Sequence, residues 1–172
     1  SVCSPTDSRY YVRELDRYFS AEAYVRYKAI VEKALVETLA KHGMCPAGLA
    51  KEIAAAADSI TVHEVEEEDR RVKHDIRALV NVIQRKVSNQ AKPYVHLAAT
   101  SYDIVDTANA LRYRQAVESV IIPDMVKLEK VWIELARKER DTVQIGRTHG
   151  QFADPITFGF ALAQYVNRWG NR

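Results

Sequence analysis

The sequence has few cysteines, no excess of either charge and no long apolar run, and each absence excludes a class of protein. Cys3 and Cys45 are the only two cysteines, too few and too far apart for a disulfide framework or a four-ligand zinc site. The 25 basic and 23 acidic residues leave a formal net charge of +2, which gives no general case for nucleic acid or an anionic membrane as partner. No apolar run approaches the roughly 20 residues of a membrane span, and no signal peptide is visible. We therefore expect a soluble, cytoplasmic protein with neither nucleic acid nor membrane as partner.

Helical periodicity dominates what is present. Between Ser20 and His42 apolar residues recur every three or four positions, Ser20 can cap the start of this helix, and Gly43 can end it. Thr61 and Glu64 match a capping box and predict another helix start. These patterns indicate a chain built mainly from helices.

Longer helices are expected in the second half. The pattern stays helical from about Thr100 to Arg140, with a kink or restart near Pro123, which lacks the N–H needed in mid-helix. After a short extended link, Asp154 can cap a last helix with Pro155 at its first position. No series of strands is visible, so the sequence predicts an all-α fold.

The stretch GRTHGQ, Gly146 to Gln151, is the most informative in the chain. His149 carries an imidazole, the side chain whose unperturbed pKa lies nearest neutrality, so it can give or take a proton. The flanking glycines permit close approach of backbone and substrate. Arg147 can hold an anion, and Gln151 can both donate and accept hydrogen bonds. An ordinary polar loop explains the stretch equally well by itself, so its meaning depends on the rest of the chain.

Two further polar clusters lie near the N-terminus and at an expected helix start. SPTDSRYY places Arg9 beside Tyr10, a pair that can reach a phosphate and a sugar, or can simply belong to a turn. In TSYD, Thr100 and Ser101 can cap a helix, yet two hydroxyls beside exposed backbone N–H groups also form a ready site for a carboxylate or phosphate.

A third cluster, KHDIR, lies within the helix expected from about residue 73 to residue 87. On such a helix Lys73 and Arg77 lie one turn apart, while His74 points elsewhere and Asp75 follows it. Taken alone, this cluster is typical of a solvated helix face.

In order, SPTDSRYY, KHDIRALV, HLAATSYDIVDTA and IGRTHGQFADPITFG resemble adenylosuccinate lyases, members of the fumarase/aspartase superfamily. The resemblance runs from about Ser4 to Arg172, and RTHGQ and TSxDxxDT are its most specific parts. The Gly after His149 favours adenylosuccinate lyases over fumarases and argininosuccinate lyases, which more often carry Leu there. Ala98, Tyr102 and Phe152 stand where the family often has Gly, Ser and His.

The resemblance implies the release of fumarate by β-elimination from adenylosuccinate, giving AMP, and from succinyl-aminoimidazole-carboxamide ribotide. It implies that His149 is the general acid and that Thr100 and Ser101 bind the succinyl carboxylate. It implies that Arg9 and Tyr10 contact the nucleotide end, that His74 and Asp75 lie near the phosphate, and that Thr148 and Gln151 hold and orient the substrate. No metal or organic cofactor is implied.

The resemblance also implies an organisation. A small N-terminal helical domain would span 1–109, and the first long helices of a fumarase/aspartase-type bundle would span 110–172. The intact enzymes are homotetramers whose active sites are shared between subunits. Their GSSxMPxKxNP-type loop, which carries the serine base, does not occur before Arg172. We therefore expect the N-terminal portion of a longer enzyme, with little or no activity by itself. A non-catalytic helical oligomerisation or anion-binding module, and another lyase of the superfamily, remain alternatives.

Overall fold

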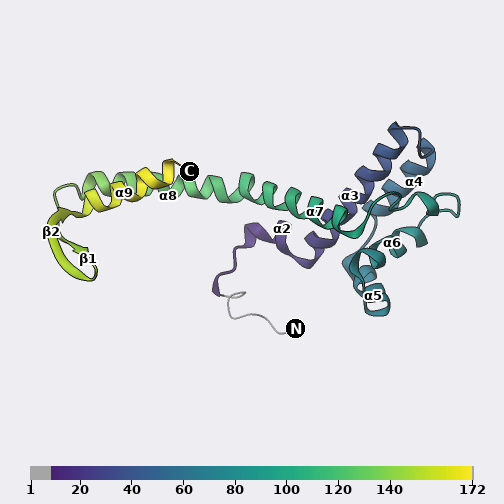
Figure 1. The fold of residues 1–172 in the computed structure, drawn as a ribbon, viewed down its shortest axis with the longest axis horizontal. Helices are drawn as coiled ribbons and strands as arrows, with labels where there is room; N and C mark the ends of the chain where they lie inside the picture. The colour runs from purple at the N-terminus through teal and green to yellow at the C-terminus, as the bar shows by residue number, and fades with distance from the viewer. Residues whose placement is uncertain (1–8, 172) are drawn as a thin grey trace. The chain divides into compact units, whose positions relative to one another are not determined.

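The computed structural model describes residues 9–171 and is mainly helical, with one small antiparallel sheet (Figure 1). This confirms the predicted fold class. The chain divides into two compact units, Ser1–Ala116 and Val117–Arg172, called unit 1 and unit 2 below. The domain boundary expected after residue 109 stays a prediction.

Unit 1 is a helical domain built around α3. Its elements are η1 (Arg13–Leu15), α2 (Asp16–Phe19), α3 (Ala21–Lys41), α4 (Ala47–Asp58), α5 (Val62–Val72), α6 (Asp75–Arg85), η2 (Lys92–Tyr94) and α7 (Ser101–Ala116). Helix α3 packs against α4, α5 and α7, and α6 packs against α5. The core includes Ile53, Ile76, Leu79, Ile83 and Ile104, each at most 2% exposed.

The helix starts of unit 1 follow the local signals in the sequence. The Ser20 hydroxyl accepts a hydrogen bond from the Ala23 N–H at 3.1 Å and caps α3. Thr61 and Glu64 form the predicted capping box at α5, since the Glu64 carboxylate accepts the Thr61 N–H at 2.8 Å. Both predicted caps are confirmed.

Unit 2 is a pair of helices joined by a β-hairpin. Its elements are η3 (Val117–Ile121), which is a turn of π-helix, α8 (Ile122–Lys138), β1 (Val143–Thr148), β2 (Gln151–Thr157) and α9 (Phe158–Gly170). Pro123 lies in the first turn of α8, directly after the π-helical turn, which confirms the predicted restart. The Trp132 ring packs between the helices, 5.3 Å from the Trp169 ring and 6.2 Å from the Tyr165 ring.

The start of the last helix differs from the expectation. Asp154 and Pro155 lie inside β2 and do not begin α9, so the predicted cap was wrong. Thr157 caps the helix instead, because its hydroxyl accepts the Phe160 N–H at 3.1 Å. Proline is tolerated in β2 because each strand of a two-stranded sheet is an edge strand.

Candidate functional site

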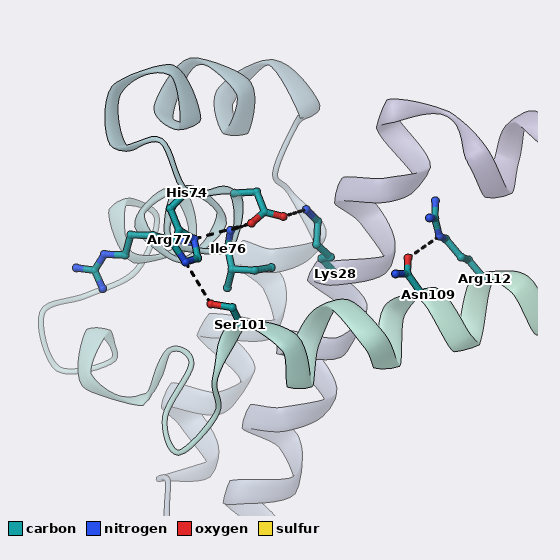
Figure 2. Close-up of polar contacts among 8 residues, drawn as sticks. Lys28, His74, Ile76, Arg77, Ser101, Asn109 and Arg112 are labelled. Atoms are coloured by element: carbon teal, nitrogen blue, oxygen red, sulfur yellow. Dashed lines mark hydrogen bonds and ion pairs between the residues drawn. The ribbon is translucent and has the colours of Figure 1, made fainter. Parts of the chain in front are cut away.

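His74 and Ser101 come together where α6 and α7 begin. His74 is the N-cap of α6, and its Nδ1 accepts a hydrogen bond from the Arg77 backbone N–H at 3.2 Å. Because Nδ1 is the acceptor, the proton of the neutral ring lies on Nε2. This nitrogen is 3.4 Å from the Ser101 hydroxyl, as Figure 2 shows. Helix capping therefore directs one ring nitrogen of His74 at the first residue of α7.

The chain around Lys73 is a helix junction and not a helix face. Lys73 ends α5 with left-handed backbone (φ 56°), and its N–H bonds to the Asp69 carbonyl oxygen. His74 then begins α6, so the expected stacking of Lys73 and Arg77 one helical turn apart was wrong. The sequence KHD has no Gly to mark the break, since a lysine here adopts the conformation usually left to glycine.

Asp75 connects the pair of His74 and Ser101, called the His74–Ser101 cluster below, to the buried side of α3. Its Oδ2 pairs with Lys28 Nζ at 2.9 Å, and its Oδ1 accepts the Ile76 N–H at 2.8 Å. Burial alone raises the pKa of the Asp75 carboxyl, but the hydrogen bond and charge of Lys28, together with the Ile76 N–H, hold this pKa below its ordinary value. Asp75 is therefore a fixed, ionised carboxylate at neutral pH.

An open pocket of about 470 Å³ adjoins this cluster. It is lined by Asp69, Lys73, His74, Asp75, Ser101, Tyr102 and Val105. Beside Ser101, the Thr100 N–H donates to the Asp103 carboxylate at 2.8 Å, which orders the start of α7. The imidazole, hydroxyl and ammonium groups near two helix N-termini can bind an anion such as a carboxylate or a phosphate, and the carboxylates of Asp69 and Asp75 lie in the same lining.

In unit 2, His149 lies at the tip of the hairpin. Thr148 pairs with Gln151, so His149 and Gly150 form a two-residue turn, and both have positive φ (52° and 74°). Positive φ at both central positions is the pattern of a type I′ turn, which matches the twist of the flanking strands. A left-handed conformation costs a non-glycine residue about 1–2 kcal/mol. Thr148, His149 and Gln151 are all exposed, so the hairpin presents the imidazole between two hydrogen-bonding side chains.

A bulge in β2, where Ala153 and Asp154 lie opposite Gly146 of β1, shapes the hairpin near this tip. The register shifts between Ile145 and Arg147, and a Cβ on Gly146 would lie 2.6 Å from the Asp154 carbonyl oxygen. Any other residue at this position would force the strands apart. Past the bulge, the Arg147 guanidinium lies 5.0 Å from the centre of the Phe152 ring, a cation–π contact. The bulge increases the local twist and so sets the direction of the residues that follow.

Arg9 and Tyr10 stand at the beginning of the described chain, and the SPTDS part of their motif lies outside the described residues. Both side chains are exposed, Tyr10 by 72%. Within residues 9–171, His74 and Asp75 make their polar contacts with residues other than Arg9 and Tyr10. Arg77 donates to His74, and Lys28 pairs with Asp75. The structure thus groups His74, Asp75, Thr100 and Ser101 in unit 1 and Thr148, His149 and Gln151 in unit 2.

Sequence reasoning did not select two residues of α3, Lys28 and Glu32. Lys28 and Glu32 are buried, and His96 Nδ1 lies 2.6 Å from Glu32 Oε1. The sequence did contain a signal for Lys28 and Glu32. Tyr24, Lys28, Glu32 and Val36 follow each other at four-residue spacing and so share one face of the helix, which places two charges on its buried side.

Within residues 9–171, no group of three or more His, Cys, Asp and Glu side chains is arranged to hold a metal ion. Over the same residues, none of the helices has the length and apolar composition needed to cross a bilayer.

Comparison with known proteins decides the family. The family model for lyases matches residues 5–172. The chain belongs to this lyase family. This lyase-family chain is 38% identical over 165 residues to the adenylosuccinate lyase of Methanothermobacter thermautotrophicus, a match that covers 95% of the chain and 36% of that protein. It is 33% identical over 159 residues to an N-acetyl-S-(2-succino)cysteine lyase of Enterococcus italicus, covering 91% of the chain and 34% of that protein.

The fold has close counterparts among solved structures. The fumarate lyase from Mesorhizobium sp. BNC1 superposes with a TM-score of 0.79 at 31% identity, over 92% of this lyase-family chain and 37% of that structure. The chain spans about 36% of the length of two curated adenylosuccinate lyases to which it is 38% identical.

Proposed function

We propose that this chain forms part of an adenylosuccinate lyase, which releases fumarate from adenylosuccinate to give AMP, and from succinyl-aminoimidazole-carboxamide ribotide. The observation that carries the proposal is the approach of His74 Nε2 to the Ser101 hydroxyl, at 3.4 Å, beside an open pocket. Two of the motifs that resemble adenylosuccinate lyases, KHD and TSYD, thus contribute to one anion-binding environment. The relatives at 38% identity with that name support the same substrate class.

Substrate binding in this proposal uses groups that suit two carboxylates and a phosphate. Thr100 and Ser101 bind the succinyl carboxylate through their hydroxyls and the N-terminal N–H groups of α7. His74 and Asp75 lie near the phosphate, and the Arg77 N–H fixes the orientation of the imidazole. On the hairpin, Thr148 holds the substrate. The exposed amide of Gln151 orients it.

Arg9 and Tyr10 complete the proposed site at the nucleotide end. A guanidinium can bind a phosphate through two parallel hydrogen bonds, and a phenol can bind a sugar hydroxyl. Both side chains are exposed and so are accessible to a ligand.

The proposed reaction is a β-elimination with His149 as general acid. A base removes the proton from the carbon next to a carboxylate, and that carboxylate holds the electron pair in a doubly charged intermediate. The pair then forms the double bond of fumarate while the carbon–nitrogen bond breaks. The nitrogen leaves with the electrons of that bond and takes a proton from His149. The base is a serine that lies outside these residues, and fixed hydrogen-bond donors stabilise the charge without a metal or organic cofactor.

We also propose that the complete protein is a cytoplasmic homotetramer with active sites shared between subunits. The apolar side chains that α8 and α9 expose, among them Val131 (56%) and Phe160 (53%), support association through unit 2. A shared site also accounts for hydrogen-bonding groups divided between two units of one chain.

A substrate panel tests the proposed function. The complete reading frame that encodes these residues is expressed, and fumarate release is measured with adenylosuccinate and with N-acetyl-S-(2-succino)cysteine. We expect kcat/KM for adenylosuccinate to be higher by at least about 100-fold, since a site built for a purine nucleotide leaves polar groups unpaired with the smaller substrate. The present chain, assayed alone, should release little or no fumarate.

Two outcomes would overturn the proposal. Preference for the cysteine adduct would indicate a carbon–sulfur lyase of the same family. Self-association without turnover of either substrate would indicate a non-catalytic helical module.

A further inference from the structure

Helix α3 carries two buried charges one turn apart. Lys28 is 1% exposed and Glu32 is 2% exposed, and a buried charge is costly unless its partners satisfy it. Each reaches across to a different segment of the candidate site. Lys28 pairs with Asp75 at 2.9 Å, and Glu32 lies 2.6 Å from His96.

Lys28 is well satisfied. Besides Asp75, its ammonium has the Tyr24 ring, whose centre lies 3.7 Å away. Burial lowers the pKa of Lys28, while the hydrogen bond and charge of Asp75 act in the opposite direction. Figure 2 shows Lys28 reaching from α3 toward the start of α6, where His74 lies.

Glu32 is only half satisfied. Its Oε1 contacts His96 Nδ1, but its Oε2 is buried and has no hydrogen-bond partner within the described part of the chain. Burial raises the pKa of Glu32, and the charge and hydrogen bond of His96 oppose this. An apolar side chain of similar volume would fill this position at a lower cost in folding free energy than a buried carboxylate, so packing alone does not explain Glu32.

Glu68, which is also buried, provides the contrast. Its Oε1 accepts a hydrogen bond from Asn81 at 2.7 Å, its Oε2 pairs with Arg85 at 3.1 Å, and Arg71 contacts both oxygens. Hydrogen bonds from Arg71 and Asn81, with the charge of Arg85, lower the pKa of Glu68 to about 2. Glu68 has the partners expected of a structural ion pair, whereas the one polar contact of Glu32 within residues 9–171 is to His96.

His96 begins a strained segment that ends at the candidate carboxylate site. His96 and Ala98 both have left-handed backbone, with φ of 61° and 62°, and each costs about 1–2 kcal/mol for a residue other than glycine. The next residues, Thr100 and Ser101, are the start of α7. A conformation of this kind persists only where surrounding contacts hold it, and the Glu32 carboxylate is the side-chain anchor of His96.

We propose that Glu32 is a positioning residue that accepts the Nδ1–H of His96 and thereby holds the turn from His96 to Ala99 that presents Thr100 and Ser101. The bond also fixes the ring tautomer, leaving the lone pair of the neutral imidazole on Nε2. Lys28 anchors Asp75 beside His74, and Glu32 anchors the turn before Ser101. Helix α3 therefore positions both residues of the His74–Ser101 cluster. That this cluster binds substrate rests on the proposed function; the positioning role does not.

Nuclear magnetic resonance on the present chain tests the proposal without any substrate. In the native protein we expect the neutral His96 ring to carry its proton on Nδ1. Glu32→Gln keeps an acceptor oxygen and should retain this tautomer. Glu32→Leu removes the acceptor, so the ring should change to the Nε2–H form, and amide exchange from Leu97 to Ser101 should quicken by about tenfold or more relative to α6.

Val36→Ala is the matched control, because Val36 is 1% exposed and lies one turn further along α3. It should change exchange in α6 and in the segment from Leu97 to Ser101 by the same factor and leave the His96 tautomer unchanged. An Nε2–H ring in the native protein, or a Glu32→Leu variant with unchanged relative exchange, would overturn the proposal. If these results hold while the complete protein releases no fumarate, only the proposed function fails.

Discussion

In unit 1 the large apolar side chains of α6, such as Leu79 and Ile83, are fully buried, whereas in unit 2 Val131 of α8 and Phe160 of α9 are 56% and 53% exposed. None of the described residues of α8 is buried. The stabilisation from apolar surface is roughly proportional to the area removed from water. Unit 1 therefore supplies its own stability, while unit 2 has an apolar surface that gains stability only when something covers it.

This difference bears on the two parts of the candidate site. The His74–Ser101 cluster rests on a core that is complete within unit 1, so its geometry is set by contacts already present. His149 lies on an exposed hairpin, and the apolar faces of α8 and α9 that support this hairpin are open. The part with the proposed general acid is therefore the part that exposes large apolar side chains on its supporting helices.

The largest expected effect on stability comes from truncating a core side chain of unit 1. Ile83→Ala should lower the free energy of unfolding by about 2–5 kcal/mol, through lost burial and a cavity. Val131→Ala in unit 2 should change it by less than about 0.5 kcal/mol, because the side chain is already exposed. Urea denaturation followed by circular dichroism measures both variants.

The tryptophans separate the two units in the same experiment. The sequence has two, Trp132 and Trp169, and both lie in unit 2, so their fluorescence reports unit 2 alone. We expect Ile83→Ala to shift the dichroism transition and leave the fluorescence transition in place. Equal shifts in both signals would indicate that the two units unfold as one cooperative unit.

A smaller effect concerns acid stability. The Lys86 hydrogen bond and the Thr61 N–H lower the pKa of Glu64 to about 2, and Glu68 has a similar pKa, against an ordinary value of 4.5 for each. A lowered carboxyl pKa stabilises the folded state above the ordinary value and loses that contribution as the pH falls through the folded value. Unit 1 should therefore lose stability between pH 4.5 and about pH 2.

Glu68→Gln sharpens this test, because it removes one of the titrating groups and should flatten the pH dependence of unit 1. Asp141→Asn is the control in unit 2, since the Arg140–Asp141 pair is 77% and 86% exposed and contributes little. Thermal unfolding at several pH values, followed by circular dichroism, makes the measurement. A pH dependence that Glu68→Gln leaves unchanged would contradict the assignment.

Local signals in the sequence predicted the helical part of the fold well. Ser20, Thr61 and Pro123 act through the backbone within a few residues of themselves, so their positions alone indicate where helices start. The hairpin was missed because its turn is His-Gly, not the Asn-Gly or Asp-Gly typical of such turns. Asp154 also suggested a helix cap, although it lies within β2.

The candidate site was predictable only in part, because its contacts are long-range. Lys28 meets Asp75 and Glu32 meets His96 across 47 and 64 positions of sequence. No local pattern gives those pairings. A charge on the apolar stripe of α3 could have marked both residues as unusual, but only the tertiary structure, which brings α3 to Asp75 and to His96, identifies their partners.

The central claim is tested most directly by fumarate release from adenylosuccinate in the complete protein, comparing His149→Ala with the native enzyme. His42→Ala is the matched control, since His42 is exposed at the end of α3 in unit 1. If His149 protonates the leaving nitrogen, its loss should reduce turnover by about 10²–10⁴-fold, with the helical content unchanged and the control near normal. Near-normal turnover by a folded His149→Ala enzyme would contradict the account.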